Sequence, residues 1–172
     1  RRVVITGLGI VAPNGVGVAA FLHAIKNGIS GIRFDQELAD LQFSCQISGK
    51  PIISDEMKLQ YFSELELRNF NASGILYGVM AGMEAWQDAG LPMVINDNPD
   101  WDSGTIFGTG TSGIEKFRES IYKIDDLQTR RLGSTAVAQT MNSGVSAYLG
   151  GKLGLGNQVT TNSSACTTGS ES

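Results

Sequence analysis

The chain has 172 residues, of which 41% are hydrophobic and 17% charged, and its net charge is −4. This size and composition predict one compact globular domain, and the acidic balance argues against nucleic-acid binding, which requires a basic face. The sequence has no apolar run long enough for a bilayer, its opening does not read as a signal peptide, and its two cysteines are too far apart for a disulfide framework or zinc site, so we expect a cytoplasmic protein without a metal.

The first part of the chain predicts a strand, a turn and a helix. Val3 to Ile5 is expected to form a short buried strand before the turn Gly7-Leu8-Gly9. A helix ending at Gly28 should follow, because apolar residues recur at the spacing of one helix face. These residues are Val18, Phe21, Leu22 and Ile25. His23, the one histidine, lies beside this stripe without a partner motif, and we expect a boundary or surface residue.

The next stretch predicts a strand and a weak helix. Phe43 to Ile47 alternates as a strand does, with Cys45 as a structural thiol. Asp55 to Phe70 is charged and only weakly periodic, which indicates helix without defining its ends.

A buried helix is predicted from Asn71 to Ala89. One face carries large apolar residues and another carries small ones, so neighbours can approach on most sides. Asn71 is the expected N-cap and Gly90 the expected stop.

After a polar loop from Asn96 to Asp102, strands alternate with helices, which indicates an α/β fold. Gly104 to Gly108 predicts a buried strand, and Thr109 to Gly113 a glycine-rich turn. Such a turn could cradle phosphate, but it lacks the lysine of a P-loop and the spacing of a dinucleotide fingerprint. An amphipathic helix should follow, and another from Thr140 to Lys152. The apolar positions of these two helices are Ile114, Phe117, Ile121, Ile124 and Leu127, and Val145, Tyr148, Leu149 and Leu153.

The closing segment, Asn162 to Ser172, places a cysteine among small and hydroxylated residues. Gln158 to Thr161 predicts a strand leading into it, so Cys166 should lie at or near the first turn of a helix. A helix N-terminus favours the thiolate, and its free N–H groups can hold an oxyanion, which is the environment of a nucleophile. The alternative is a small buried cysteine in a tight turn.

Several segments, in order, resemble a known family. They are Val3 to Gly15 (VVITGLGIVAPNG), Gly108 to Gly113 (GTGTSG), Met141 to Ala147 (MNSGVSA) and NSSACTTG around Cys166. Together they resemble the β-ketoacyl synthases that elongate fatty acids and polyketides, and more distantly the thiolase-like superfamily. The resemblance implies an α/β thiolase-like fold, an αβαβα layered sandwich of two similar halves. Residues 1–172 would be the N-terminal half, truncated just after the nucleophile, without the two histidines and the lysine of the other half.

The resemblance also implies a reaction. Cys166 would accept an acyl group from an acyl carrier protein, and a malonyl carrier protein would then lose carbon dioxide and attack the acyl-cysteine. The product would be a 3-oxoacyl carrier protein in fatty acid, polyene or polyketide biosynthesis. The implied partners are the carrier protein, acyl and malonyl thioesters, and a second copy or close paralogue in a dimer. No cofactor is expected.

Further positions carry over from the family. Thr111 matches a residue that gates the acyl pocket, and Thr140 and Met141 lie where the dimer partner reaches into that pocket. The residues implied to contact the carrier protein are Arg68, Arg130 and Arg131. The alternatives are that Thr111 only ties down its loop and that the charges are a solvated surface.

Three other functions are weighed against this one. A non-catalytic partner subunit that sets chain length usually lacks the cysteine, so Cys166 argues against it. A thiolase-like acyltransferase that uses coenzyme A would have different surroundings for the cysteine. A nucleotide-binding module rests only on the turn GTGTSG.

Overall fold

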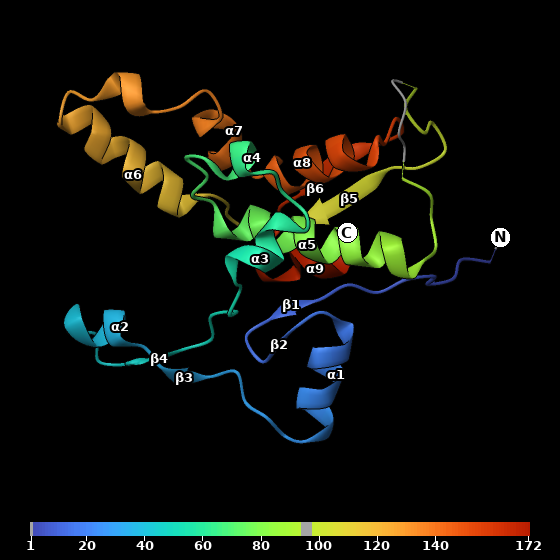
Figure 1. Ribbon diagram of the computed structural model, residues 1–172, viewed down its shortest axis with the longest axis horizontal. Coiled ribbons are helices and arrows are strands. Elements are labelled where there is room, and N and C mark those ends of the chain that lie inside the picture. The colour runs from blue at the N-terminus through green and yellow to red at the C-terminus, as the bar shows by residue number, and fades with distance from the viewer. Residues whose placement is uncertain (1, 94–97) are drawn as a thin grey trace. The chain divides into compact units, whose positions relative to one another are not determined.

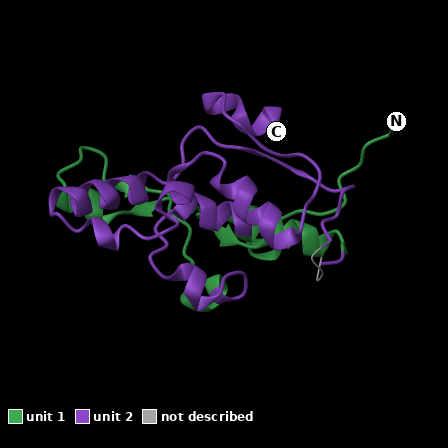
Figure 2. Ribbon diagram, turned by 90° about the horizontal axis from the view of Figure 1, so that it is seen from above, with its two compact units in different colours: residues 1–58, 80–91 green, residues 59–79, 92–172 purple. Residues whose placement is uncertain are grey.

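The computed structural model describes residues 2–93 and 98–172, which form a mixed α/β structure (Figure 1). The chain divides into two compact units, coloured separately in Figure 2. The first comprises residues 1–58 and 80–91, and the second residues 59–79 and 92–172. Helix α5 (Ser73–Asp88) therefore begins in the second unit and ends in the first.

The first unit contains short hairpins and short helices. Its elements are β1 (Val11–Ala12), β2 (Gly15–Val16), α1 (Val18–Lys26), β3 (Arg33–Phe34), α2 (Gln36–Asp40), β4 (Ile47–Ser48) and α3 (Asp55–Leu59). Strands β1 and β2 pair antiparallel, as do β3 and β4. The prediction of α1 is confirmed, with Gly28 just beyond its end at a φ of 63°, and His23 is exposed as expected.

The predicted buried strand from Val3 to Ile5 is wrong. Both of these side chains are exposed, Val3 to 92%. The segment that follows lies along α5 and is held by carboxylates in place of a neighbouring strand. The Leu8 N–H donates to Asp88 Oδ2 and the Ile10 N–H to Glu84 Oε2, both at 2.9 Å. A β-branched run predicted the extended backbone but could not reveal that its partner is a helix.

The second unit is built around the parallel strand pair β5 (Thr105–Gly108) and β6 (Val159–Asn162). Its other elements are α4 (Glu64–Leu67), α6 (Ile114–Asp125), η1 (Thr129–Arg131), α7 (Ala136–Thr140), α8 (Gly144–Leu153), η2 (Ala165–Thr167) and α9 (Thr168–Glu171). Helix α8 packs against both strands, and α9 packs against β5. The predicted strands and the helix over α6 are confirmed, with ends shifted by a residue or two. The strand from Gly104 was expected to be buried, and this is wrong at Ile106, which is 50% exposed.

The core of the second unit lies between the first half of α5 and α8. Its buried apolar side chains are Phe62, Ala72, Ile75, Leu76, Val79, Val145, Leu149 and Leu153. Gly78 of α5 is required there, because a Cβ at this position would lie 2.6 Å from Val145 Cγ1 and 2.8 Å from Phe107 Cζ. The predicted close approach of neighbours to α5 is therefore confirmed at Gly78.

Two predicted helices begin later than expected. Helix α5 begins at Ser73, two residues after Asn71, so Asn71 is not its N-cap, and the Asn71 side-chain amide donates to Glu119 Oε2 at 3.0 Å. The helix expected from Thr140 is interrupted, because Met141 adopts an extended backbone between α7 and α8. Gly90 ends α5 as predicted, with a φ of 67°.

Three further predictions are corrected or only partly tested. The stretch from Asp55 to Phe70 forms two short helices, α3 and α4, the second begun by a capping box between Ser63 and Glu66. Only Ile47 of the predicted strand from Phe43 belongs to β4, and Cys45 is exposed. Residues 96 and 97 of the predicted polar loop lie outside the described residues, and Asp100 in the same loop bridges to Leu155.

Helix α6 is amphipathic as predicted, but its apolar stripe is the exposed side. Phe117 is 57% exposed and Ile124 50%, whereas Lys116 on the opposite face is 1% exposed. Lys116 is buried, and Glu119 and Lys123 are partly buried, because these three take part in a hydrogen-bond network described below. Within the described residues, no helix combines the length and the apolar character needed to span a membrane.

Candidate functional site

Cys166 lies in a short 3₁₀ turn, η2, between the end of β6 and the start of α9. Its thiol is exposed, so the alternative of a buried cysteine in a tight turn is wrong. The preceding residue, Ala165, has a φ of 52°, in the left-handed region that residues with a Cβ rarely adopt. This conformation costs about 1–2 kcal/mol and persists only where surrounding contacts impose it.

The carboxylate of Glu171 receives hydrogen bonds from both sides of this turn. Asn162 Nδ2 and Ser164 Oγ donate to Glu171 Oε2 at 2.8 and 2.5 Å, and Thr167 Oγ1 lies 3.1 Å from Oε1. The bonds from Ser164, Asn162 and Thr167, in that order, hold the pKa of Glu171 below its usual value. The carboxylate is therefore ionised near neutral pH and acts only as an acceptor.

Buried Thr168 also holds this turn, through two hydrogen bonds of its hydroxyl group. The Ser164 N–H donates to Thr168 Oγ1 at 2.9 Å, and Thr168 Oγ1 donates to the Ala165 carbonyl at 2.5 Å. Gly108 at the end of β5 allows this approach, because a Cβ there would lie 2.5 Å from the Thr168 carbonyl oxygen.

The glycine-rich loop after β5 borders the cysteine turn. The Thr109 N–H donates to the Asn162 carbonyl at 3.1 Å, and a Cβ on Gly110 would lie 3.7 Å from Ala165 Cα. Thr109 Oγ1 donates to the Thr111 carbonyl at 2.6 Å, which shapes the loop. The side chain of Thr111 is exposed, and its hydroxyl makes no hydrogen bond to the described residues.

The segment between α7 and α8 forms a third side of the site. Gly113, with a φ of 61°, lies against the backbone of Gln139 and Thr140, since a Cβ there would come 1.8 Å from the Gln139 oxygen. Asn142 Nδ2 donates to Ser163 Oγ at 3.4 Å, and Met141 is 50% exposed. The structure thus brings the segments of Thr111, Met141 and Cys166 together.

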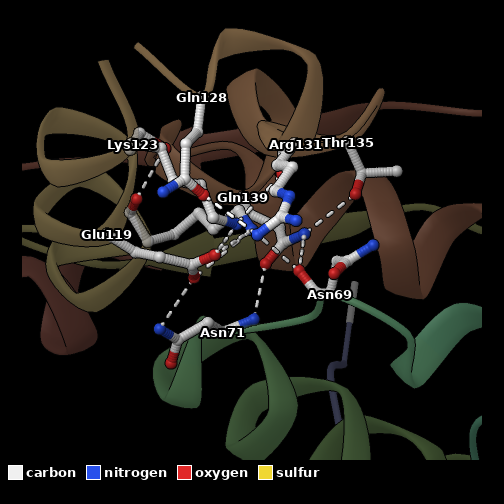
Figure 3. A network of polar contacts seen from close by, with 10 residues as sticks. Asn69, Asn71, Glu119, Lys123, Gln128, Arg131, Thr135 and Gln139 are labelled. Atoms are coloured by element: carbon white, nitrogen blue, oxygen red, sulfur yellow. Dashed lines mark hydrogen bonds and ion pairs between the residues drawn. The ribbon is translucent and has the colours of Figure 1, made fainter. Parts of the chain in front are cut away.

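A hydrogen-bond network joins α6, η1 and α7 to the loop before α5 (Figure 3). Lys116 Nζ donates to the Asn69 carbonyl at 2.9 Å and to Glu119 Oε1 at 3.3 Å. Lys123 Nζ pairs with the same Glu119 oxygen and donates to the Arg131 carbonyl at 3.0 Å. The bond from Lys123, followed by those from Asn71 and Lys116, lowers the pKa of Glu119 to about 2.

Gln139 closes this network from α7. Its Oε1 accepts from the Asn71 N–H at 2.7 Å, and its Nε2 donates to Thr135 Oγ1 at 2.8 Å and to the Asn69 carbonyl at 3.3 Å. Gln139 is fully buried. Gln139 thus links the loop before α5 to the end of α7, where Thr140 is the next residue.

The basic residues expected at the carrier surface are all exposed. Arg68 directly precedes Asn69, whose carbonyl accepts from Lys116 of the network. The carbonyl of Arg131, in η1, accepts from Lys123 of the same network. A Cβ on Gly133 would lie 3.9 Å from Asn69 Cβ, so the segments carrying Arg68 and Arg131 are neighbours. Arg131 Nη1 also donates to Gln128 Oε1 at 3.1 Å.

Among the described residues, hollows are found that do not include the cysteine in their lining. One of about 390 Å³ is lined by Glu66, Tyr148 and Lys152, among others. The other, of about 470 Å³, is lined by Pro13, Arg33 and other residues of the first unit. Neither lining includes Cys166.

Sequence reasoning identified Cys166 but missed the residues that hold it. Glu171 was passed over because an acidic residue near the end of a segment looks like a solvated charge. The available signal was its spacing of four residues from Thr167, which places the two on one helix face. The bonds from Asn162 and Ser164 depend on how the turn folds back and leave no pattern in the sequence.

Comparison with known proteins shows what this chain resembles. The family profile described as "Beta-ketoacyl synthase, N-terminal domain" matches residues 1–172. The chain is 31% identical over 175 residues to 3-oxoacyl-[acyl-carrier-protein] synthase 1 of Escherichia coli, covering 98% of this chain and 40% of that protein. It is 29% identical over 169 residues to 3-oxoacyl-[acyl-carrier-protein] synthase 2 of Vibrio cholerae, with the same coverage. The chain thus spans about 40% of the length of these relatives.

Solved structures agree on the fold. The ishigamide ketosynthase/chain length factor matches with a TM-score of 0.72 at 20% identity, covering 95% of this chain and 40% of the other. A type II PKS acyl-carrier protein in complex with its ketosynthase bound to the hexaketide matches with a TM-score of 0.71 at 24% identity, covering 98% and 39%. The predicted thiolase-like fold is thereby confirmed.

Proposed function

The chain belongs to the β-ketoacyl synthase family, and on this premise we propose that it carries the acyl-accepting cysteine of a 3-oxoacyl-carrier-protein synthase. The observation that carries the proposal is the exposed thiol of Cys166, held in the turn between β6 and α9. Curated relatives named as such synthases, matched over 98% of this chain, support it.

The chemistry assigned to this chain is acyl transfer. The Cys166 sulfur attacks the carbonyl carbon of an acyl thioester, and the carrier's thiol leaves with a proton, so the acyl group becomes bonded to Cys166. In the second step, a malonyl thioester loses carbon dioxide and its carbanion attacks the acyl-cysteine. This step forms the new carbon–carbon bond and frees the thiol. The groups expected to assist the decarboxylation, two histidines and a lysine, belong to the family's other half.

We assign the mouth of the acyl pocket to Thr111, Thr140 and Met141. Their support is the convergence of the glycine-rich loop and the segment after α7 on the cysteine turn. An acyl chain gains about 0.8 kcal/mol for each methylene it buries, so the exposed Met141 side chain suits a pocket wall. Thr111 would then limit the length of the chain that enters.

The proposed partner is an acyl carrier protein, docked on Arg68, Arg130 and Arg131. A ketosynthase of similar fold has been solved with its acyl-carrier protein, which supports this class of partner. The exposed arginines on neighbouring segments offer a positive surface to an acidic protein, and such charges mainly raise the rate of encounter.

The central test replaces Cys166 in the full-length protein. Cys166→Ala should abolish both acyl-enzyme formation and condensation with malonyl carrier protein while leaving the thermal unfolding midpoint nearly unchanged. The exposed Cys45 is the matched control, and Cys45→Ala should keep full activity. An acyl-thioester probe followed by peptide mass mapping should label Cys166 well ahead of Cys45, and equal labelling would refute the proposal.

The carrier surface has its own test. Arg130→Glu should raise KM for the acyl carrier protein about tenfold at low salt with little change in kcat, and the difference should shrink as salt is added. Lys26→Glu, an exposed reversal on α1, serves as the control for charge alone. An unchanged KM in the Arg130 variant would remove Arg130 from the docking surface.

A non-catalytic chain-length subunit is the second candidate, because one similar structure is a ketosynthase/chain length factor. It predicts that the full-length protein is inactive by itself and that Cys166→Ala leaves product formation by the assembled pair unchanged. The exposed cysteine favours the catalytic assignment.

A further inference from the structure

We propose that Glu171 is the positioning residue of the nucleophile: its carboxylate holds the turn that presents Cys166. The proposal rests on the acyl-transfer function proposed above. It assigns to Glu171 a role through its hydrogen bonds and no contact with substrate.

The first support is that the bonds come from both sides of the cysteine. Asn162 at the end of β6 and Ser164 in the turn precede Cys166, and Thr167 follows it. One carboxylate therefore ties the strand, the turn and the start of α9 together. The same three side chains also meet at Ser164, because Asn162 Nδ2 and Thr167 Oγ1 lie 3.5 and 3.2 Å from Ser164 Oγ. Of these contacts, the bonds to the Glu171 carboxylate are the charge-assisted ones.

The second support is the backbone between these anchors. Ala165 is held at a φ of 52°, which an alanine leaves readily once its surroundings stop imposing it. Thr168 and Glu171 both hold Ser164, which precedes Ala165: Thr168 Oγ1 accepts from its N–H and the Glu171 carboxylate from its hydroxyl. Loss of the Glu171 bonds should therefore let Ala165 relax and change the direction in which Cys166 points.

The charge of Glu171 is matched to this task. Its donors hold the pKa of the carboxyl below the usual value, so at neutral pH both oxygens accept hydrogen bonds. A neutral amide can keep one accepting oxygen, whereas alanine keeps none. This difference makes a graded pair of variants available.

Acyl transfer and alkylation place different demands on the turn. Acyl transfer passes through a tetrahedral oxyanion, so the sulfur must be fixed relative to the donors that receive that oxygen. Alkylation by iodoacetamide requires only an accessible sulfur. A positioning residue should therefore affect acyl transfer far more than alkylation.

The experiment uses the full-length protein and single-turnover acylation by an acyl carrier thioester. Glu171→Ala should lower the maximal rate of Cys166 acylation at least tenfold without raising KM, while its iodoacetamide alkylation rate stays within threefold of wild type. Glu171→Gln should recover most of the acylation rate. Glu56→Ala, at an exposed glutamate in α3, should match wild type in both assays.

Each other outcome overturns the proposal in an identifiable way. Acylation by Glu171→Ala within twofold of wild type removes Glu171 from the turn's support. A parallel fall of acylation and alkylation would show loss of the thiol's exposure instead of its positioning. If Glu171→Gln is as impaired as Glu171→Ala, charge and not hydrogen bonding is what matters. A wild-type protein that is alkylated but never acylated would instead refute the proposed function.

Discussion

At the scale of single residues, the charged groups buried under α6 are the most unusual feature. Lys116 is 1% exposed, yet its ammonium has both a carbonyl partner and a carboxylate partner. A buried charge is tolerated only when it is paired and hydrogen-bonded. Glu119 supplies that pairing for Lys116 and Lys123 together, so it is the residue on which the network depends.

The network makes a prediction about acid stability. Glu119 has a folded-state pKa of about 2, lowered from an ordinary 4.5. A depressed carboxyl pKa stabilises the folded state above the unfolded value, and this contribution is lost as pH falls from about 4.5 through about 2. The free energy of unfolding of wild type should therefore exceed that of Glu119→Gln at pH 6, and urea titrations should show the gap closing over that window. Glu56→Gln should show no such gap, and a gap independent of pH would contradict the assignment.

The cysteine proposed as nucleophile could be singled out from sequence, whereas the residues that hold its turn could not. Cys166 was singled out by its run of small residues together with the family resemblance of that run. Glu171 and Asn142 become recognisable only in three dimensions, because their hydrogen bonds to Ser164 and Ser163 depend on how the chain folds back.

At the scale of elements, helix α5 shows how small residues are used. Gly78 lies against Val145 and Phe107, whereas Gly74, one turn earlier, has open space around it. The two glycines carry the same helix-propensity cost of up to about 1 kcal/mol relative to alanine. Only the one at position 78 offsets that cost by letting neighbours pack closely.

Alanine substitutions at these two positions should therefore have opposite effects. Gly78→Ala should lower the free energy of unfolding by about 1–3 kcal/mol, because its Cβ would overlap Val145 and Phe107. Gly74→Ala should raise it by up to about 1 kcal/mol, since it gains helix propensity without a clash. Urea denaturation of the two variants measures both. Equal effects of the two substitutions would mean that packing at Gly78 adapts.

The periodicity of apolar residues predicted where helices form, but it did not predict which elements pack against them. The apolar residues of α6 have the spacing of a core-facing stripe, yet this stripe is exposed. The opposite side of the helix is held instead, through the bond from Lys116 to the Asn69 carbonyl. The prediction for the opening of the chain, from Val3 to Ile5, was wrong for a different reason. Its β-branched residues predicted a strand. The segment that follows is instead hydrogen-bonded to carboxylates of α5 and not to a neighbouring strand.

At the scale of the whole molecule, the open edge of β6 bears on assembly. Among the described strands, β6 pairs only with β5. The Gln158 and Asn162 carbonyls accept from β5, so by alternation the Val159 N–H faces away from it. An unpaired edge of this kind is a template for another strand, and we propose that a second copy or a close paralogue pairs there.

This proposal predicts a proline-sensitive dimer. In the full-length protein, Val159→Pro should shift the light-scattering mass at micromolar concentration from dimer toward monomer, because proline removes the outward N–H. Val159→Ala is the matched control. It loses the contact with Gly150 but keeps that N–H, so its mass should remain dimeric. A wild-type monomer, or a proline variant that stays dimeric, would contradict pairing through β6.

The parallel pairing of β5 and β6 also determines when this strand pair can form during synthesis. Thr105 must wait for Val159, because α6, α7 and α8 all lie between the two strands in the sequence. A nascent chain paused before Val159 therefore carries β5 as an unpaired strand, with the Thr109 N–H still lacking the Asn162 carbonyl. Such an edge can pair with a neighbouring nascent chain. The segment that delivers Cys166 is thus also the one that ends this exposure, and the ribosome adds it after the segments of Thr111 and Met141.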